Sequence, residues 1–155
     1  MISRTSEGWK FLSEAALEKF VCENLKMLFS ADLLKQQYNC NGEISDILAV
    51  DRDKRLLIIE LKNTEDRSII QQLTRYHANL LEVKPFPQEI DYSLLIRLIG
   101  ITPSYHRHNL IDRASSRLSF ELLQFSIVDR NPSFDFQLED IVRIRVENAR
   151  GEKIC

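Results

Sequence analysis

The sequence predicts an α/β protein in which helices cover both faces of a central mixed β-sheet. Four apolar runs are predicted to be buried strands: residues 44–50, 56–62, 92–101 and 120–128. A polar turn at 51–54 joins the first two runs as a β-hairpin, whereas helical segments separate the later ones. Hairpins pair strands antiparallel and helical crossovers pair them parallel, so the predicted sheet is mixed.

The first half of the chain is predicted to begin with a helix from Ser13, its N-cap, to about Phe29. Apolar residues recur there at helical spacing: Leu17, Phe20, Val21, Leu25 and Leu28. Residues 36–40 are predicted to form a short edge strand, and Asn41-Gly42 a turn into the hairpin. After the hairpin, a polar run at 63–66 leads into a second helix that ends near Glu82.

In the second half, Pro85 and Pro87 interrupt the chain before the strand at 92–101. A loop then leads into a short helix at about 109–117, and the strand at 120–128 follows. Residues 134–146 alternate only in places and are expected to be strand or irregular. The predicted order of elements is α-β-β-β-α-β-α-β.

Size and composition predict one globular domain over residues 1–155. The net charge of −2 gives no general attraction to nucleic acid, so a polyanion would need a local basic patch or metal ions. Three cysteines without CxxC spacing are expected to be free thiols in a reducing compartment. No run approaches the ~20 apolar residues of a membrane span, and the N-terminus lacks an apolar signal region. We therefore expect a cytoplasmic protein.

The hairpin places three charged residues among apolar ones: Asp46 on its first strand, and Glu60 and Lys62 on one face of its second. Buried charges are costly unless they pair or hold a metal ion. Two carboxylates suit Mg²⁺, which completes its coordination with water and phosphate oxygens. A lysine beside them can orient or deprotonate an attacking water, or stabilise a phosphate. The alternative is an edge hairpin with solvated charges, against which the apolar neighbours Ile59 and Leu61 argue.

These residues resemble the signature of the PD-(D/E)XK nuclease superfamily. Asp46 is followed, after thirteen residues, by Glu60-Leu61-Lys62, with Ser45 in place of the proline that names the motif. The helix that starts Ser13-Glu14-Ala15-Ala16-Leu17-Glu18 is similar to the family's opening acidic helix, and Gln72-Leu73-Thr74-Arg75-Tyr76 resembles its QxxxY element. The NucS-like and RecB-like branches are the most similar. The resemblance implies a restriction-endonuclease-like fold with an α-β-β-β-α-β core.

The resemblance also implies roles for single residues. Asp46, Glu60 and the Leu61 backbone carbonyl would hold Mg²⁺, for which Mn²⁺ would substitute. The expected catalytic residues are Asp46, Glu60, Lys62, Glu18 and Gln72, with Lys62 activating the water. Tyr76 and Arg75 would contact DNA, although Arg75 is equally well explained as a solvated charge. Glu14 and Glu18 lie one helical turn apart, and either suits the auxiliary acid; the deeper Glu18 is favoured.

Together these features predict a Mg²⁺-dependent DNA endonuclease of restriction or repair type. Cleavage of both strands would favour a homodimer, since one site handles one strand. The second possibility is a non-catalytic nuclease-fold module that binds DNA or serves as a scaffold. The complete Asp-Glu-Lys set argues against it. A metal-dependent phosphohydrolase acting on nucleotides is the third possibility, and the lack of a P-loop motif disfavours it.

Overall fold

Seven strands form one sheet in the computed structural model of the chain, which describes residues 1–6, 8–141 and 146–153. In spatial order they are β3 (Ala31–Cys40), β4 (Glu43–Asp51), β5 (Leu56–Leu61), β6 (Arg97–Thr102), β7 (Phe120–Arg130), β8 (Ser133–Asp140) and β9 (Val146–Glu152). The order in space follows the order in the chain, so each strand pairs with its sequence neighbours.

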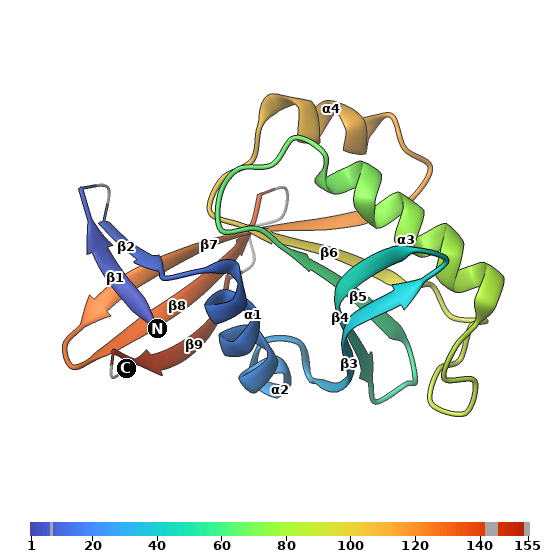
Figure 1. Ribbon diagram of the computed structural model, residues 1–155, viewed down its shortest axis with the longest axis horizontal. Helices are drawn as coiled ribbons and strands as arrows, with labels where there is room; N and C mark the ends of the chain where they lie inside the picture. Colours follow the sequence, from blue (N-terminus) through green and yellow to red (C-terminus); the bar gives the residue numbers. More distant parts are fainter. Residues whose placement is uncertain (7, 142–145, 154–155) are drawn as a thin grey trace.

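Strand directions follow from the connections. Short turns join β3, β4 and β5 and likewise β7 and β8, and these pairs are antiparallel, as is β8 with β9. The pairs β5–β6 and β6–β7 are parallel, and their connections contain α3 (Ile69–Val83) and α4 (Arg107–Ala114). In Figure 1 these two helices lie above the sheet, whereas α1 (Glu14–Glu23) and α2 (Leu25–Phe29) lie below it. The predicted mixed sheet with helices on both faces is confirmed.

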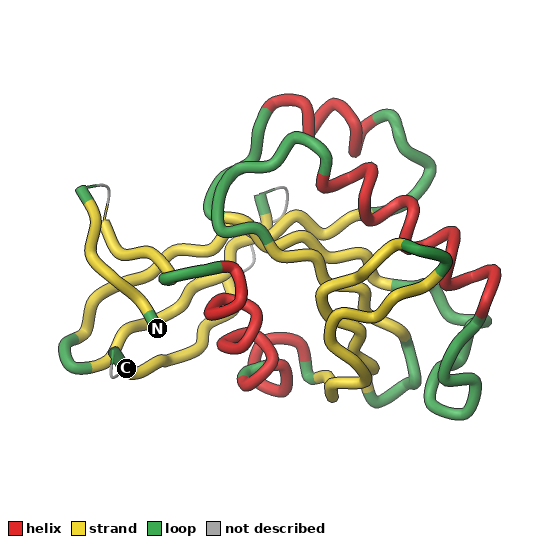
Figure 2. Tube along the Cα trace, viewed as in Figure 1, coloured by secondary structure: helices red, strands yellow, loops and turns green. Residues whose placement is uncertain are grey.

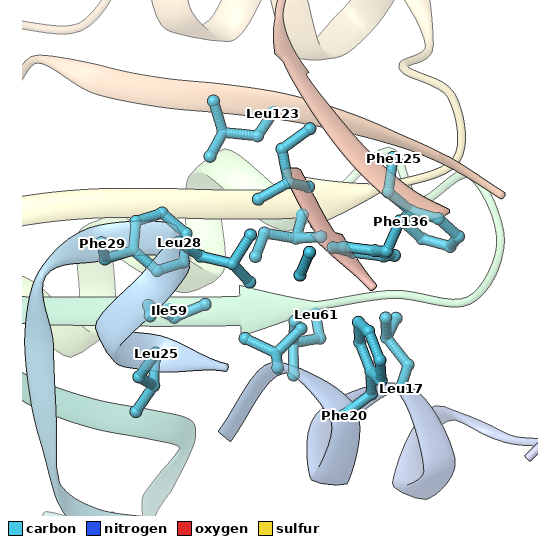
Figure 3. Packing of buried hydrophobic residues seen from close by; sticks show 14 of the residues in the cluster. Leu17, Phe20, Leu25, Leu28, Phe29, Ile59, Leu61, Leu123, Phe125 and Phe136 are labelled. Atoms are coloured by element: carbon cyan, nitrogen blue, oxygen red, sulfur yellow. The ribbon is translucent and has the colours of Figure 1, made fainter. Parts of the chain in front are cut away.

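A cluster of buried apolar residues covers each face of the sheet. Under α1 and α2, Leu17 and Phe20 pack with Ile59 and Leu61 of β5, as Figure 3 shows. Phenylalanines of β2, β7 and β8 complete this side: Phe11, Phe125, Phe134 and Phe136. On the other face, α3 packs its apolar side on the sheet through Ile69, Ile70, Leu73, Tyr76 and Leu80. The helices α1 and α3 both contact β4 and β5, the two strands of the predicted hairpin.

An N-terminal hairpin of β1 (Ile2–Thr5) and β2 (Gly8–Phe11) was not predicted, because its four-residue strands mix polar and apolar residues. It forms a separate two-stranded sheet whose second strand packs beside β7, at the left of Figure 1. Phe11 is 3% exposed and lies among the aromatic rings of the core. The hairpin thereby leads the chain directly into α1.

The prediction of one continuous helix from Ser13 to Phe29 is wrong, because this segment forms two helices, α1 and α2. Ser13 does cap α1, since its hydroxyl accepts the Ala16 amide over 3.0 Å. The helix ends at Glu23, and the side chain of the next residue, Asn24, donates to the Phe20 carbonyl over 2.8 Å before α2 begins at Leu25. An asparagine side chain that bonds to the backbone competes with the helical hydrogen bonds, which explains the break.

Two predicted strands have different bounds. The edge strand predicted at 36–40 extends over Ala31–Cys40, and its first part was missed because it is mostly exposed and does not alternate regularly between polar and apolar residues. The strand predicted at 92–101 begins only at Arg97. Asp91 accepts hydrogen bonds from the Ser93 amide and hydroxyl, so the chain turns there instead of extending.

Further along, the helix predicted at 109–117 starts earlier, at Arg107, because the His106 side chain caps it. The region 134–146 contains most of β8 and the first residue of β9, while 142–145 lie outside the described residues. Cys22 and Cys40 are free thiols, as predicted, and Cys155 lies outside the described residues. Figure 2 shows the helices as short segments, and within the described part of the chain none is long and apolar enough to span a membrane.

Candidate active site

Asp46 and Glu60 come from neighbouring antiparallel strands. The pairing of β4 with β5 sets Ile47 opposite Ile59. Asp46 precedes Ile47 and Glu60 follows Ile59, so the two acids are neighbours across the antiparallel pair. The Asp46 carboxylate reaches across and accepts the backbone amide of Leu61 through Oδ2 over 2.9 Å. The two acids thus meet where β5 ends.

Glu60 is 3% exposed, which is unusual for a carboxylate. Its Oε2 accepts the Tyr76 hydroxyl over 3.3 Å and lies 3.5 Å from the Lys62 ammonium. Its Oε1 is buried and accepts no hydrogen bond in the part of the chain that the structure describes. A buried acceptor without a donor is costly, so this oxygen is suited to a ligand that carries positive charge.

Burial, and then the charge of Asp46, raises the pKa of Glu60 to about 9, while Lys62 opposes the rise. Two carboxylates that share a desolvated site resist being ionised together. A cation between them would remove this penalty, because it compensates both charges.

Lys62 follows β5 directly, and its side chain is 19% exposed. Its ammonium lies between Glu60 and Asp66, at 3.5 and 3.6 Å. Burial alone would lower the pKa of Lys62, but the nearby carboxylates outweigh it and raise the pKa. Lys62 therefore stays an ammonium at neutral pH, which favours charge stabilisation over proton abstraction.

Glu18 approaches the site from α1 through two glutamines of β3. Gln36 donates to its Oε2 over 2.8 Å, and Gln37 donates to its Oε1 over 2.6 Å. The same Gln37 amide nitrogen lies 3.2 Å from Oδ1 of Asp46, so it joins the two acids. Burial, with the charges of Asp46 and Glu14 adding to it, raises the pKa of Glu18 despite these hydrogen bonds.

Glu14 lies one turn earlier and has a different partner. Its Oε1 accepts the backbone amide of Asn63, the residue after Lys62, over 3.3 Å. Both acids line an open pocket of about 450 Å³, together with Ala15, Gln36, Gln37, Asp46 and Leu61. Of the two, Glu18 is the one connected to Asp46.

The predicted residues of α3 lie at different depths. Tyr76 is buried with its hydroxyl on Glu60. Arg75 is half exposed and forms an ion pair with Glu43 over 3.0 Å. The Gln72 side-chain carbonyl is buried and accepts no hydrogen bond from the described residues. The structure therefore joins Asp46, Glu60, Lys62, Tyr76 and Glu18 through contacts, while Arg75 stands apart from them.

Two contacts at this site were not predicted from the sequence, that of Gln37 with Asp46 and that of Asp66 with Lys62. Gln37 belongs to an exposed stretch of β3 without any motif, and only the strand pairing shows that it faces Asp46. Asp66 belongs to the polar run after Lys62 and pairs with it because the chain turns back there. The spacing of four residues between Lys62 and Asp66 was the one available signal.

The donor set fits a hard divalent cation with few protein ligands. No group of three or more His, Cys, Asp or Glu residues suited to a metal occurs in residues 1–6, 8–141 and 146–153. Mg²⁺, however, takes only one or two carboxylates and keeps several waters. Asp46 and Glu60, with the free Oε1 of Glu60, meet that lower requirement.

Comparison with solved structures identifies the fold. The sequence matches no protein-family model and no curated protein. It is similar in structure to EndoMS in a complex with dsDNA2 (TM-score 0.57) and to a repair endonuclease from Pyrococcus abyssi (TM-score 0.55). Each match has 22% identity and covers 72% of this chain, but only 44% and 47% of the two endonucleases. The chain thus has the restriction-endonuclease-like fold of these nucleases and spans less than half of their length.

Proposed function

We propose that the protein is a divalent-metal-dependent endonuclease that hydrolyses phosphodiester bonds in DNA, with Mg²⁺ as the cofactor and Mn²⁺ as a substitute. One observation carries the proposal. The buried Glu60 carboxylate has a free oxygen beside Asp46, with a lysine ammonium 3.5 Å from its other oxygen, at the ends of two strands. The fold supports the proposal, since the similar solved structures include a repair endonuclease.

The acidic residues and the lysine would have different roles because they carry opposite charges. Asp46, Glu60 and the Leu61 carbonyl would hold the ion. A bound divalent cation would polarise the phosphate and lower the pKa of the attacking water. Lys62, as an ammonium, would stabilise the negative charge that grows on the phosphate oxygens, and it would orient the water. Water adds to phosphorus, the bond to one ester oxygen breaks, and that oxygen leaves with a proton.

Residues around these three would support them. The Tyr76 hydroxyl, whose pKa burial raises, remains protonated and donates to Glu60. Glu18 would act as the auxiliary acid through Gln37, and Gln72 would complete the outer part of the site. Arg75 is exposed enough to contact the DNA backbone. We propose action in the cytoplasm, with two copies of the chain acting together where both strands are cut.

The proposal is tested by incubating the purified protein with single-stranded, flapped, mismatched and plain duplex DNA. Each substrate is given Mg²⁺, Mn²⁺ or EDTA, and Glu60→Gln serves as the inactive control because it removes the charge and keeps the shape. We expect cleavage of at least one substrate with Mg²⁺ or Mn²⁺, none in EDTA and none by Glu60→Gln. If the protein binds DNA but cleaves no substrate with Mg²⁺ or with Mn²⁺, the result would instead favour a non-catalytic nuclease-fold module.

A further inference from the structure

Gln37 has an unusual backbone for a strand residue. Its φ is +51°, in the left-handed region, although it lies inside β3. Residues other than glycine, asparagine and aspartate adopt this region at a cost, because Cβ crowds the following carbonyl. The pairs on either side, Gln36 with Ile47 and Tyr38 with Ser45, place Gln37 directly opposite Asp46. A strained residue at this position suggests that its side chain has a use.

The side chain of Gln37 joins two acids that would otherwise face each other. Its amide nitrogen lies 2.6 Å from Oε1 of Glu18 and 3.2 Å from Oδ1 of Asp46. An amide NH₂ has two hydrogens, so one group can donate to both carboxylates. Both acids are negative when ionised, and the charge of Asp46 adds to burial in raising the pKa of Glu18. The amide therefore occupies the place between two carboxylates that a cation would also favour.

We propose that Gln37 is a positioning residue that limits the candidate site to one divalent ion by occupying the space between Glu18 and Asp46. The inference rests on the proposed function only in taking Asp46 and Glu60 to bind divalent ions. Asp46 then serves a single ion, shared with Glu60, and Glu18 remains outside the metal coordination. A third carboxylate in place of the amide would remove the hydrogen-bond donor and add charge, so a second ion would bind between Glu18 and Asp46.

The neighbouring glutamine provides a matched control. Gln36 donates to the other oxygen of Glu18 over 2.8 Å, and the pairing sets it opposite Ile47 instead of Asp46. Gln36→Glu therefore adds the same charge beside Glu18 on the same strand. It leaves the amide between Glu18 and Asp46 in place.

The test is calorimetric titration of Mn²⁺ into the EDTA-stripped full chain. We expect one ion per chain in the wild type and in Gln36→Glu, and two ions per chain in Gln37→Glu. Thermal unfolding in EDTA checks that each variant is folded. Gln37→Asp replaces Gln37→Glu if the latter does not fold, because aspartate adopts left-handed backbone more readily and carries the same charge.

The outcomes separate this inference from the proposed function. One ion in the wild type and one in a folded Gln37→Glu would overturn the inference alone, as would two ions in the wild type. Two ions in both Gln36→Glu and Gln37→Glu would also overturn it, because added charge and not the bridge would then decide. A wild type that binds no Mn²⁺ would overturn the proposed function and this inference together.

Discussion

The carboxylate of Asp46 accepts a hydrogen bond from the backbone amide of Leu61 over 2.9 Å. Leu61 ends β5, and its side chain is 2% exposed in the core under α1. The first acid of the candidate site is thus held by the backbone of the strand that carries the second acid, Glu60. Its position depends on the pairing of β4 with β5 and on the packed core below.

Replacing Lys62 by alanine should reduce DNA cleavage by about 10²–10³-fold, the usual effect of removing one donor to a developing oxyanion. Its affinity for Mn²⁺ should be unchanged or higher, because the ammonium repels the incoming cation. Single-turnover cleavage and Mn²⁺ titration measure the two effects. Lys54→Ala, on the exposed turn between β4 and β5, is the control and should change neither. Equal losses of metal binding and cleavage in Lys62→Ala would remove Lys62 from the chemistry.

The stability of the metal-free protein should depend on the ionisation of Glu60. Burial raises the pKa of Glu60 to about 9 in the folded state, well above the value of about 4.3 in an unfolded chain. The folded state therefore binds a proton that the unfolded state releases between these values. Wild-type stability should fall relative to Glu60→Gln as pH rises from about 5 to 9, because stability decreases where the folded state holds more protons.

Urea unfolding in EDTA at a series of pH values measures this dependence. The difference in unfolding free energy between Glu60→Gln and the wild type should grow steadily with pH. Glu65 is exposed in the loop after Lys62, so the unfolding free energy of Glu65→Gln should depend on pH in the same way as that of the wild type. Parallel curves for Glu60→Gln and the wild type would show that Glu60 ionises normally.

Tyr76→Phe distinguishes support of Glu60 from contact with DNA. Tyr76 is 6% exposed and donates to Glu60 over 3.3 Å, so the loss of its hydroxyl should lower kcat and leave KM for DNA unchanged. The stability loss should be about 1 kcal/mol, typical of one hydrogen bond. Tyr92→Phe, which loses a hydroxyl bond to the Pro85 carbonyl, is the matched control without an effect on kcat. A raised KM with unchanged kcat would instead support the DNA contact that the QxxxY resemblance implies.

DNA binding should require divalent ions, because Asp46 and Glu18 otherwise repel phosphates from the site and the net charge is −2. Ca²⁺ has the same charge as Mg²⁺ but looser geometry, so it should give a stable, uncleaved complex. Fluorescence anisotropy with labelled DNA in Ca²⁺ and in EDTA, at two salt concentrations, measures this. Affinity should also fall with salt, since Arg and Lys side chains would make the remaining contacts with the phosphates. Equal binding in EDTA and Ca²⁺ would contradict this account of how DNA is held.

The sequence predicted the parts of the fold that follow apolar pattern. The strands β4, β5 and β7 are rich in apolar residues, and α3 has a clear apolar side, so the apolar pattern located them. Where polar side chains determine the backbone, it failed. Asn24 breaks the first helix and Asp91 delays β6, and both act through side-chain hydrogen bonds that periodicity does not register.

The candidate site was predictable to the same extent. Asp46, Glu60 and Lys62 stand in a recognisable spacing on two adjacent strands, and the structure brings them together. The preference for Glu18 over Glu14 rested on its depth in the helix and its place beside Leu17, whereas the connection of Glu18 to Asp46 depends on Gln37. No sequence motif marks Gln37, because its position follows from the register of β3 with β4 and from its own left-handed backbone.

The most direct test of the central claim is Mn²⁺ titration of the wild type and Asp46→Asn. Asparagine keeps an oxygen for the Leu61 amide, while it removes the charge and replaces Oδ1, which accepts from Gln37, by an NH₂ group. Asp53→Asn, exposed on the turn of the same hairpin, is the matched control. We predict saturable Mn²⁺ binding by the wild type and by Asp53→Asn, and its loss in a folded Asp46→Asn. Unchanged Mn²⁺ affinity in Asp46→Asn, or no binding by the wild type, would contradict a shared metal site at Asp46 and Glu60.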